Sequence, residues 1–320
     1  MHTSIYTEND KEKVFNLYYE VYDLQITDEW WNWRFNKFGK PIRYLMWDND
    51  KLVGHYVLHP IPMKLENELT LGLQSMSILT HRLYQNKGII FSTLAKLAYE
   101  EALKQNYKVL FGFPNELSYR FCFEHLDWIK FSNILEFHRN LEQSKPSFSS
   151  KLSIESCSDF GNVEILWKKF SQNYPYCVSR TSSFLKWRFL EHPKTPFLNR
   201  SSFQYFPFLI KENNEPKLFF VLKIYGDKGH IVDYFGDLNP ETIETMLTYS
   251  TDFCIKNKLL SLNFWSNLSD NFTLCDIAKK LGFAVKTPSS YFGIFPLSNA
   301  TSNIINQKNW FITMSDSDNF

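Results

Sequence analysis

The chain carries an internal repeat, which restricts its possible folds more than any other feature. Trp33-Arg34-Phe35 in the first half recurs as Trp187-Arg188-Phe189 in the second, 154 positions later. Phe113 and Phe264 are 151 positions apart, and Trp128 and Phe283 are 155 apart. A nearly constant offset over matched positions indicates duplication of one structural unit. The sequence therefore predicts two copies of the same fold.

The periodicity of each half predicts alternating helices and strands. In the first half we expect helices at 8–22 and 28–38, a hairpin of strands at 44–47 and 52–58, a strand at 71–80, a helix from 89, a strand at 109–113, a helix at 115–126, and one or two strands at 129–139. Pro60 and Pro62 mark an edge or a bulge at the end of the hairpin. The fold class is α+β with mixed α/β sheets. We expect an N-terminal domain at 1–142, a serine-rich linker at 143–150 and a C-terminal domain at 151–320.

Composition excludes several classes of function. The net charge is +1, from 35 basic and 34 acidic residues, and no basic stripe for a nucleic acid is visible. No apolar run reaches the roughly 18 residues of a membrane helix, and the N-terminus does not resemble a secretion signal. The five cysteines form no CxxC pair, which favours reduced thiols in a cytoplasmic protein. No metal-ligand spacing is present, so we expect no metal.

One stretch carries a signal for ligand binding. Leu71 to Ala102 reads as a strand, a polar loop containing Gly88, and an amphipathic helix. Backbone N–H groups and the dipole at a helix N-terminus favour an anion. An ordinary strand–turn–helix would show the same pattern.

The loop residues Thr80 to Ile90 resemble the GCN5-related N-acetyltransferase (GNAT) superfamily. His81, Tyr84, Gly88 and Ile89 match the superfamily pattern, whereas Asn86 and Ile90 replace glycines. The resemblance implies two tandem GNAT-like folds that use acyl-CoA, with its pyrophosphate on the amides of residues 85–90. It implies donor contacts at Ile78, Leu79, Thr80, Gln85, Asn86, Lys87, Gly88, Ile89, Ile90 and Asn115.

The second copy departs from this pattern where the pyrophosphate would bind. It lacks the glycine loop and carries Asp233, Asp237 and Glu241. Like charge there is unfavourable, so we expect no coenzyme A in the second half. That half could shape the acceptor cleft or only support the first half.

Further stretches resemble tandem GNAT proteins of bacterial surface-polysaccharide pathways. They include Gly54-His55-Tyr56, Gly112-Phe113-Pro114-Asn115 and the tail from Trp310 to Asp318, in which Trp310 and Phe311 indicate docking. The resemblance implies an N-acyltransferase that moves an acetyl or 3-hydroxybutanoyl group to a nucleotide-linked 3-amino-3,6-dideoxyhexose. Candidate contacts for that sugar are Tyr56, Gln74, Asp233, Trp265 and the tail acids Asp316 and Asp318.

Transfer to an amine requires a base, a held oxyanion and a proton for the leaving thiolate. The strand at 71–80 carries no carboxylate, so the nearest imidazole, His55, is the candidate base. The resemblance implies a tyrosine as the acid, but its position falls on Cys122 or on Phe123, depending on the register, so Tyr119, one turn before Phe123, is the candidate acid. His55 and Tyr119 could each instead be an ordinary packing residue.

Two other functions stay open at this point. One is an aminoacyl transferase that uses charged tRNA on a similar tandem fold, although the basic face it would need is not visible. The other is a degenerate GNAT that only binds, which Asn86 and Ile90 favour slightly.

Overall fold

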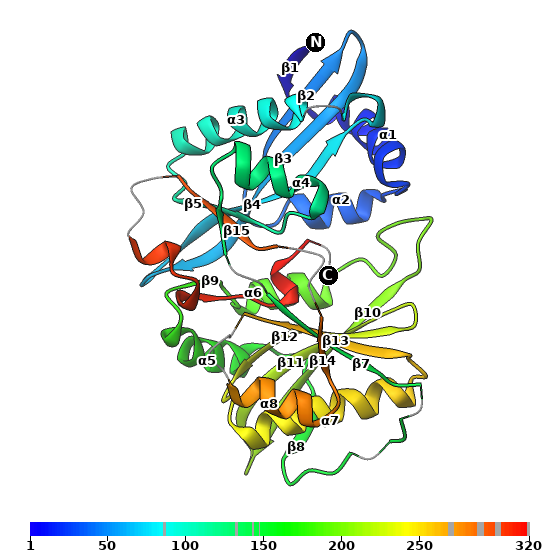
Figure 1. Cartoon of the computed structure of the whole chain (residues 1–320), viewed down its shortest axis with the longest axis vertical. Helices are drawn as coiled ribbons and strands as arrows, with labels where there is room; N and C mark the ends of the chain where they lie inside the picture. The colour runs from blue at the N-terminus through cyan, green and yellow to red at the C-terminus, as the bar shows by residue number, and fades with distance from the viewer. Residues whose placement is uncertain are drawn as a thin grey trace.

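Two mixed β-sheets, one in the upper half and one in the lower half of Figure 1, form the framework of the molecule. The structure is a computed structural model that describes residues 1–85, 88–131, 134–142, 144–146, 148–267, 272–286, 291–297 and 302–318. The first sheet has the order β1-β2-β3-β4-β5-β15-β6, with β9 on β3 and β16 on β9. The second has the order β14-β7-β13-β12-β11-β10-β8. This architecture confirms the predicted mixed α/β fold class.

The strands of the first sheet come mainly from the first half of the chain. They are β1 (His2–Ile5), β2 (Ile42–Asp48), β3 (Lys51–Leu65), β4 (Glu68–Thr80), β5 (Val109–Gly112), β6 (Ile129–Lys130), β9 (Tyr176–Val178), β15 (Gly293–Pro296) and β16 (Trp310–Phe311). The strands of the second sheet are β7 (Leu135–Asn140), β8 (Ser153–Ser156), β10 (Phe203–Glu212), β11 (Glu215–Tyr225), β12 (Lys228–Gly236), β13 (Ser261–Ser266) and β14 (Ala284–Lys286).

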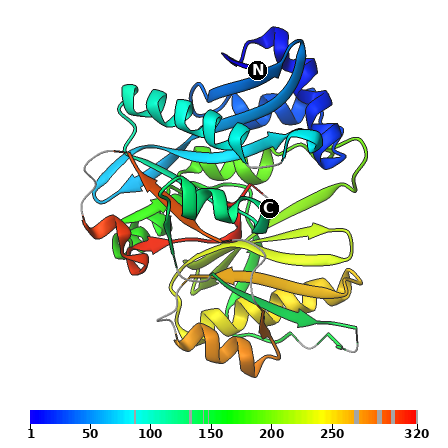
Figure 2. The same cartoon turned by 45° about the horizontal axis from the view of Figure 1, so that its top comes forward.

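Helices cover both faces of each sheet. The α-helices are α1 (Lys11–Tyr22), α2 (Asp28–Phe35), α3 (Ile89–Lys104), α4 (Glu116–Arg120), α5 (Gly161–Phe170), α6 (Ser182–Leu185), α7 (Pro240–Lys256) and α8 (Phe272–Lys280). Helix α3 shares a core with one face of the first sheet, and α1 and α2 share a core with the other. In the second half, α7 and α8 lie on the outer face, whereas α5 and α6 lie between the two sheets (Figures 1 and 2).

Local sequence explains where key helices begin. The Asn115 side chain accepts hydrogen bonds from the backbone N–H groups of Leu117 and Ser118, at 3.0 and 3.1 Å, and so caps α4. Asn239 caps α7 in the same way, and Pro240 occupies its first turn. Gly88 precedes α3 with a φ of 61°, a conformation that glycine adopts without cost.

The hairpin strand β3 is longer than the sequence predicts. Pro60 and Pro62 lie inside it and pair with Leu73 and Leu71 of β4. They fall between Leu58, where pairing with β2 ends, and Met63, where pairing with β9 begins. Proline has no backbone N–H to donate, and this is tolerated where a strand pairs with another strand on one side only. Strand β3 can therefore continue through both prolines.

The two halves exchange their last strands. Strand β7 belongs to the first half in sequence but pairs with β13 and β14 of the second sheet. Strand β15 lies near the C-terminus but inserts between β5 and β6 of the first sheet. The sheets therefore do not divide the chain at residues 143–150, where the sequence suggests a linker between independent domains.

The repeated Trp-Arg-Phe motifs meet between the two sheets. The rings of Trp33 and Trp187 stack with centroids 4.8 Å apart. Trp33 Nε1 donates to the Trp187 carbonyl at 2.8 Å, and Trp187 Nε1 donates to the Trp33 carbonyl at 2.9 Å. Lys37 and Glu191, also equivalent in the repeat, form an ion pair at 3.2 Å. These reciprocal contacts relate the two copies by an approximate twofold axis.

The strand exchange generates a prediction about the isolated halves. A fragment ending at Pro146 would lack β15, so β5 would lose a neighbour and β6 would lose the strand with which it pairs. We expect fragments 1–146 and 147–320 to aggregate or to show no cooperative thermal unfolding when expressed separately. Co-expressed, they should purify together and unfold as one unit. A cooperative melt of fragment 1–146 alone, near the melting temperature of the intact chain, would contradict this.

Candidate active site

Strands β4 and β5 open a gap in the first sheet. They pair only at Leu73 with Leu110 and at Gln74 with Phe111, and beyond these residues they diverge. A β-bulge in β4 leaves Ser77 and Ile78 without partner residues on β3, and Ser77 has a φ of 52°. Such a bulge turns backbone groups out of the ladder, where a ligand can reach them.

A cavity of about 640 Å³ fills this gap. The residues around it come from both halves of the chain and from the C-terminal tail. They are Tyr18, Val21, Tyr22, Leu24, Trp30, Ser75, Met76, Ser77, Ile78, Thr80, Gln85, Gly88, Phe91, Gly112, Phe113, Pro114, Asn115, Leu117, Ser118, Phe121, Cys122, Trp128, Phe197 and Asp318. Asp318 is the only one of these described residues with a formal charge.

One end of the cavity lies at the N-terminus of α3. Gly88 lines it, and the first N–H groups of the helix are directed there by helix geometry. Five of the residues predicted to contact the donor line the cavity: Ile78, Thr80, Gln85, Gly88 and Asn115.

The other predicted donor residues have different positions. Leu79 packs in the core under α1, Ile90 is buried in the core under α3, and Ile89 is 54% exposed. Asn86 and Lys87 lie outside the described residues.

The other end of the cavity is aromatic. Trp30 of α2 lies 6.1 Å from Tyr18 of α1 and 5.6 Å from Phe197 of the second half, measured between ring centroids. The Tyr22 hydroxyl donates to the carbonyl of Ile78 at 2.8 Å, which ties α1 to the β4 bulge. None of these aromatic residues was among the predicted contacts. The clustering of tyrosines and tryptophans in the first two helices was the signal for Tyr18, Tyr22 and Trp30, and no signal pointed to Phe197.

Two arginines reach the C-terminal end of α1 beside this aromatic end. Arg82 Nη2 donates to the carbonyl of Val21, and Arg200 Nη2 donates to the carbonyl of Tyr22, each at 3.5 Å. Both side chains belong to exposed residues, and Arg200 also pairs with Asp23 at 3.5 Å. Exposed cations therefore lie next to the cavity, in contact with the backbone of its lining residues.

His55, the base expected from sequence, is fully buried and does not line the cavity. Its Nδ1 donates to the Ser77 carbonyl at 3.1 Å, so the ring supports the bulge from behind. Burial and the nearby Arg43 charge lower the pKa of His55 to about 3, which keeps the imidazole neutral. This position fits a structural histidine.

Tyr119, the expected acid, also lies outside the cavity lining. Its hydroxyl accepts a hydrogen bond from Lys130 Nζ at 2.8 Å, and its ring packs on Tyr291 with centroids 4.6 Å apart. Cys122, one turn further on, does line the cavity, and burial raises the pKa of its thiol to about 12. The thiol is therefore protonated at neutral pH.

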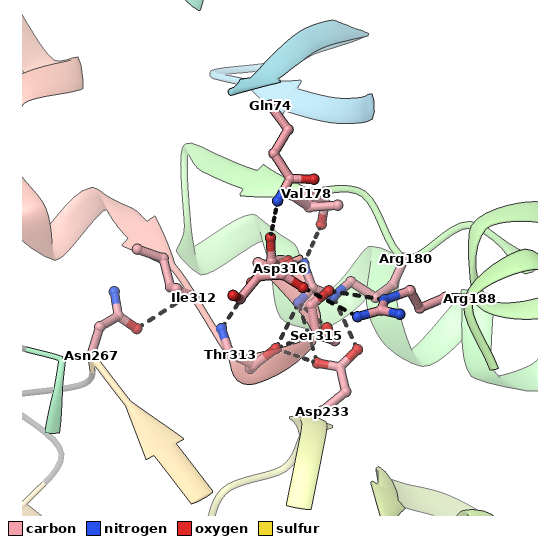
Figure 3. Close-up of polar contacts among 11 residues, drawn as sticks. Gln74, Val178, Arg180, Arg188, Asp233, Asn267, Ile312, Thr313, Ser315 and Asp316 are labelled. Carbon is pink, nitrogen blue, oxygen red and sulfur yellow. Dashed lines mark hydrogen bonds and ion pairs between the residues drawn. The ribbon is translucent and has the colours of Figure 1, made fainter. Parts of the chain in front are cut away.

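Of the six residues predicted to contact the acceptor, five are buried away from the main cavity, and the sixth, Asp318, lines it. The Tyr56 hydroxyl bonds to Ser75 Oγ at 2.6 Å, and Trp265 packs 5.9 Å from Phe113. Gln74, Asp233 and Asp316 join the network that holds the C-terminal tail (Figure 3).

In the second copy, the corresponding gap is occupied by this tail. Strands β12 and β13 pair only up to Ile231 and Phe264. Beyond that point Asn267 bonds to the backbone of Trp310 and Ile312, and Thr313 Oγ1 donates to Asp233 at 2.9 Å. The tail thus fills the space that stays open between β4 and β5 in the first copy.

Within the described residues, no group of three or more acidic, histidine or cysteine side chains is arranged to hold a metal ion. None of the described helices combines the length and the hydrophobicity needed to cross a bilayer.

Comparison with known proteins identifies the class of the first half. Residues 3–125 match the acetyltransferase (GNAT) domain family, so the chain carries a domain of the class that transfers acyl groups from acyl-CoA to amines. No curated protein is significantly similar to the chain in sequence. The predicted acyl-CoA-dependent N-acyltransferase is thereby confirmed as a class, and what it acylates stays open.

Solved structures show the same fold over nearly the whole chain. A probable N-acyltransferase from Enterococcus faecalis superposes with a TM-score of 0.68 at 12% identity, covering 92% of this chain and 72% of that one. A GCN5-related N-acetyltransferase from Anabaena variabilis gives 0.67 at 11% identity, covering 93% and 73%. Saccharomyces cerevisiae N-myristoyltransferase with bound myristoyl-CoA gives 0.60 at 14%, covering 92% and 78%. Both halves thus share the fold of two-domain GNAT proteins.

Gly88 provides a test of the donor end. A Cβ at Gly88 would overlap the Phe121 ring, which lines the same cavity, so Gly88→Ala must displace that ring. We expect the Kd for acetyl-CoA, measured by calorimetry, to rise at least about tenfold, or about 1.4 kcal/mol. Gly226→Ala is a matched control, because Gly226 has a similar φ of 58° with nothing within 4 Å of the added carbon. Equal acetyl-CoA affinity in both variants would show that the donor binds elsewhere.

Proposed function

We propose that this protein transfers an acyl group, acetyl or 3-hydroxybutanoyl, from acyl-CoA to the amine of a nucleotide-linked amino sugar for surface-polysaccharide biosynthesis. The observation that carries the proposal is the single cavity that joins the glycine at the start of α3 to an aromatic chamber through the gap between β4 and β5. A donor and an acceptor entering from opposite ends would meet at the β4 bulge.

The donor side is supported by its shape and its polarity. A pyrophosphate needs backbone donors and little side-chain bulk, which Gly88 and the first turn of α3 supply. A pantetheine arm is an extended chain with amide groups, and Ser77 and Ile78 have no partner residue on β3. Their carbonyls already accept hydrogen bonds from His55 and Tyr22, so we assign the contact with the arm to their N–H groups. Apolar residues such as Phe91 and Leu117 line the remainder of this end.

The acceptor side offers features that suit a nucleotide-linked sugar. Trp30 and Phe197 present faces on which a nucleobase can stack. Arg82 and Arg200 lie at the edge of the chamber, where they can pair with the diphosphate that links base and sugar. The sugar itself would then extend toward the bulge.

The chemistry requires a neutral amine within reach of the thioester carbon. Attack of the amine forms the C–N bond, and the carbonyl oxygen becomes an oxyanion that a backbone N–H at the bulge can stabilise. Collapse breaks the C–S bond and releases coenzyme A. The first residues of α3 hold the donor, and the chamber orients the acceptor, so both reactants lose their freedom of motion before reaction.

The direct test is a free-thiol release assay over a panel of nucleotide-linked amino sugars, with acetyl-CoA and 3-hydroxybutanoyl-CoA as donors. We expect one amino sugar to support turnover with a kcat/KM well above those of the free sugar and of its hydroxyl analogue. Turnover restricted to amines without a nucleotide would contradict the proposed acceptor.

The two rim arginines generate a separate prediction. Arg82→Ala and Arg200→Ala should each raise KM for the nucleotide-linked acceptor about tenfold and leave KM for acetyl-CoA unchanged, because each removes one charged contact to the diphosphate. The effect should shrink at high salt. Lys168→Ala, an exposed lysine on α5, is the control. If neither arginine variant changes the KM for the acceptor, the diphosphate does not bind at Arg82 and Arg200.

A further inference from the structure

The C-terminal tail ends at the cavity with an acidic side chain. After β16 the chain makes the turn Met314–Asp316 and reaches Asp318, which lines the cavity. The preceding residues are held firmly: Arg188 donates to the carbonyls of Ser315 and Ser317, each at 3.2 Å, and Gln74 Nε2 donates to the carbonyl of Asp316 at 2.8 Å. Asp318 therefore follows a backbone that is fixed from both halves of the molecule.

A buried ion-pair network fixes the same turn (Figure 3). Arg180 pairs with Asp316 at 2.8 Å and with Asp233 at 3.2 Å, and all three side chains are excluded from solvent. Arg180 Nη2 also donates to Thr313 and Ser315 at 3.0 and 3.1 Å. These contacts satisfy Asp316 and Asp233 internally, so neither acid is free to act on a substrate.

Asp318, in contrast, has no ion-pair partner among the described residues. The charged and titratable groups that face it are Tyr18 and Tyr22 of α1, Arg34 of α2, and Arg188. Arg34 uses its guanidinium on Met76 Sδ, at 3.1 and 3.3 Å, and on Gln74 Oε1, at 3.4 Å. The Asp318 carboxylate thus lines the cavity and interacts with Tyr22, whose hydroxyl bonds to Ile78 of the β4 bulge.

We propose that Asp318 is the general base that removes the proton from the acceptor amine, an inference that rests on the proposed acyl transfer. As the nitrogen bonds to the thioester carbon, one N–H proton passes to the carboxylate. The C–S bond then breaks with its electron pair on sulfur, and the proton on Asp318 leaves to that thiolate or to water. The products, the amide and free coenzyme A, contain all the atoms of the amine and the acyl-CoA.

The other titratable groups of the cavity do not suit this role. Burial raises the pKa of Tyr18, Tyr22 and Cys122, so all three are protonated at neutral pH and cannot accept a proton. His55 lies behind the bulge. Of the described groups that line the cavity, the carboxylate alone is both present as a base and open to a ligand.

The surroundings of Asp318 also suit proton transfer. Protein atoms packed around its carboxyl group raise its pKa above the ordinary value for an aspartate, although the residue keeps a solvent-exposed surface, and the charges of Arg34 and Arg188 offset part of that rise. A carboxylate with a raised pKa is a stronger base. Because the active form is deprotonated, kcat should fall on the acidic side, as pH decreases through this pKa.

The variant Asp318→Asn tests the proposal with the amine that the wild-type enzyme acylates. We expect kcat to fall about 10²- to 10⁴-fold, with KM for acetyl-CoA and the melting temperature unchanged. The acidic limb that belongs to Asp318 should disappear from the pH profile of kcat. Asp318→Glu should restore part of the rate, and formate should rescue Asp318→Gly. Asp276→Asn, on exposed α8, is the control.

Slow thiol release from acetyl-CoA without an acceptor gives a second readout, since a base in the cavity also activates water. If no amino sugar reacts but the rate of acetyl-CoA hydrolysis is lower in Asp318→Asn than in the wild-type protein, the proposed acceptor is wrong. The assignment of Asp318 as the base is then supported independently. If Asp318→Asn keeps the wild-type rate and pH profile in both assays, Asp318 is not the base.

Discussion

The exchange of β7 and β15 is the constraint on which the rest of the structure depends. Each sheet is complete only with a strand from the other half. The stacked Trp33 and Trp187 and one continuous core then fix the angle between the sheets. A rigid relation between the halves is what allows one cavity to take lining residues from both, as Phe197 and Asp318 show.

Duplication supplied two equivalent gaps, and the chain uses them differently. In the first copy the gap beside β4 stays open, whereas in the second the tail occupies the space beside β12. Asp233 is central to this difference. From sequence it is expected to repel a pyrophosphate, and in the structure it binds Arg180 and Thr313. The acid therefore anchors the segment that reaches the other copy.

Local patterns predicted the elements well because they depend on near neighbours. The cap at Asn115, the glycine before α3 and the α/β order of each half all follow from short stretches of sequence. The exchange of strands could not be predicted, since β7 and β15 are short, and a few residues of sequence do not specify which sheet a short strand joins. The same limit affected the site: His55 and Tyr119 have suitable chemistry, but which way a strand or helix residue faces depends on tertiary packing.

The missing carboxylate on β4 explains why a distant segment should complete the site. Residues 74–77 of β4 are Gln, Ser, Met and Ser, and the last three line the cavity. An acid placed there would lie close to Arg34, which already bonds to Gln74 and Met76, and would form a buried ion pair with reduced basicity. The tail acid Asp318 lies near Arg34 but forms no ion pair with it among the described residues, and the backbone before it is held by Arg188 and Gln74. The arrangement keeps a charge near the cavity without neutralising it.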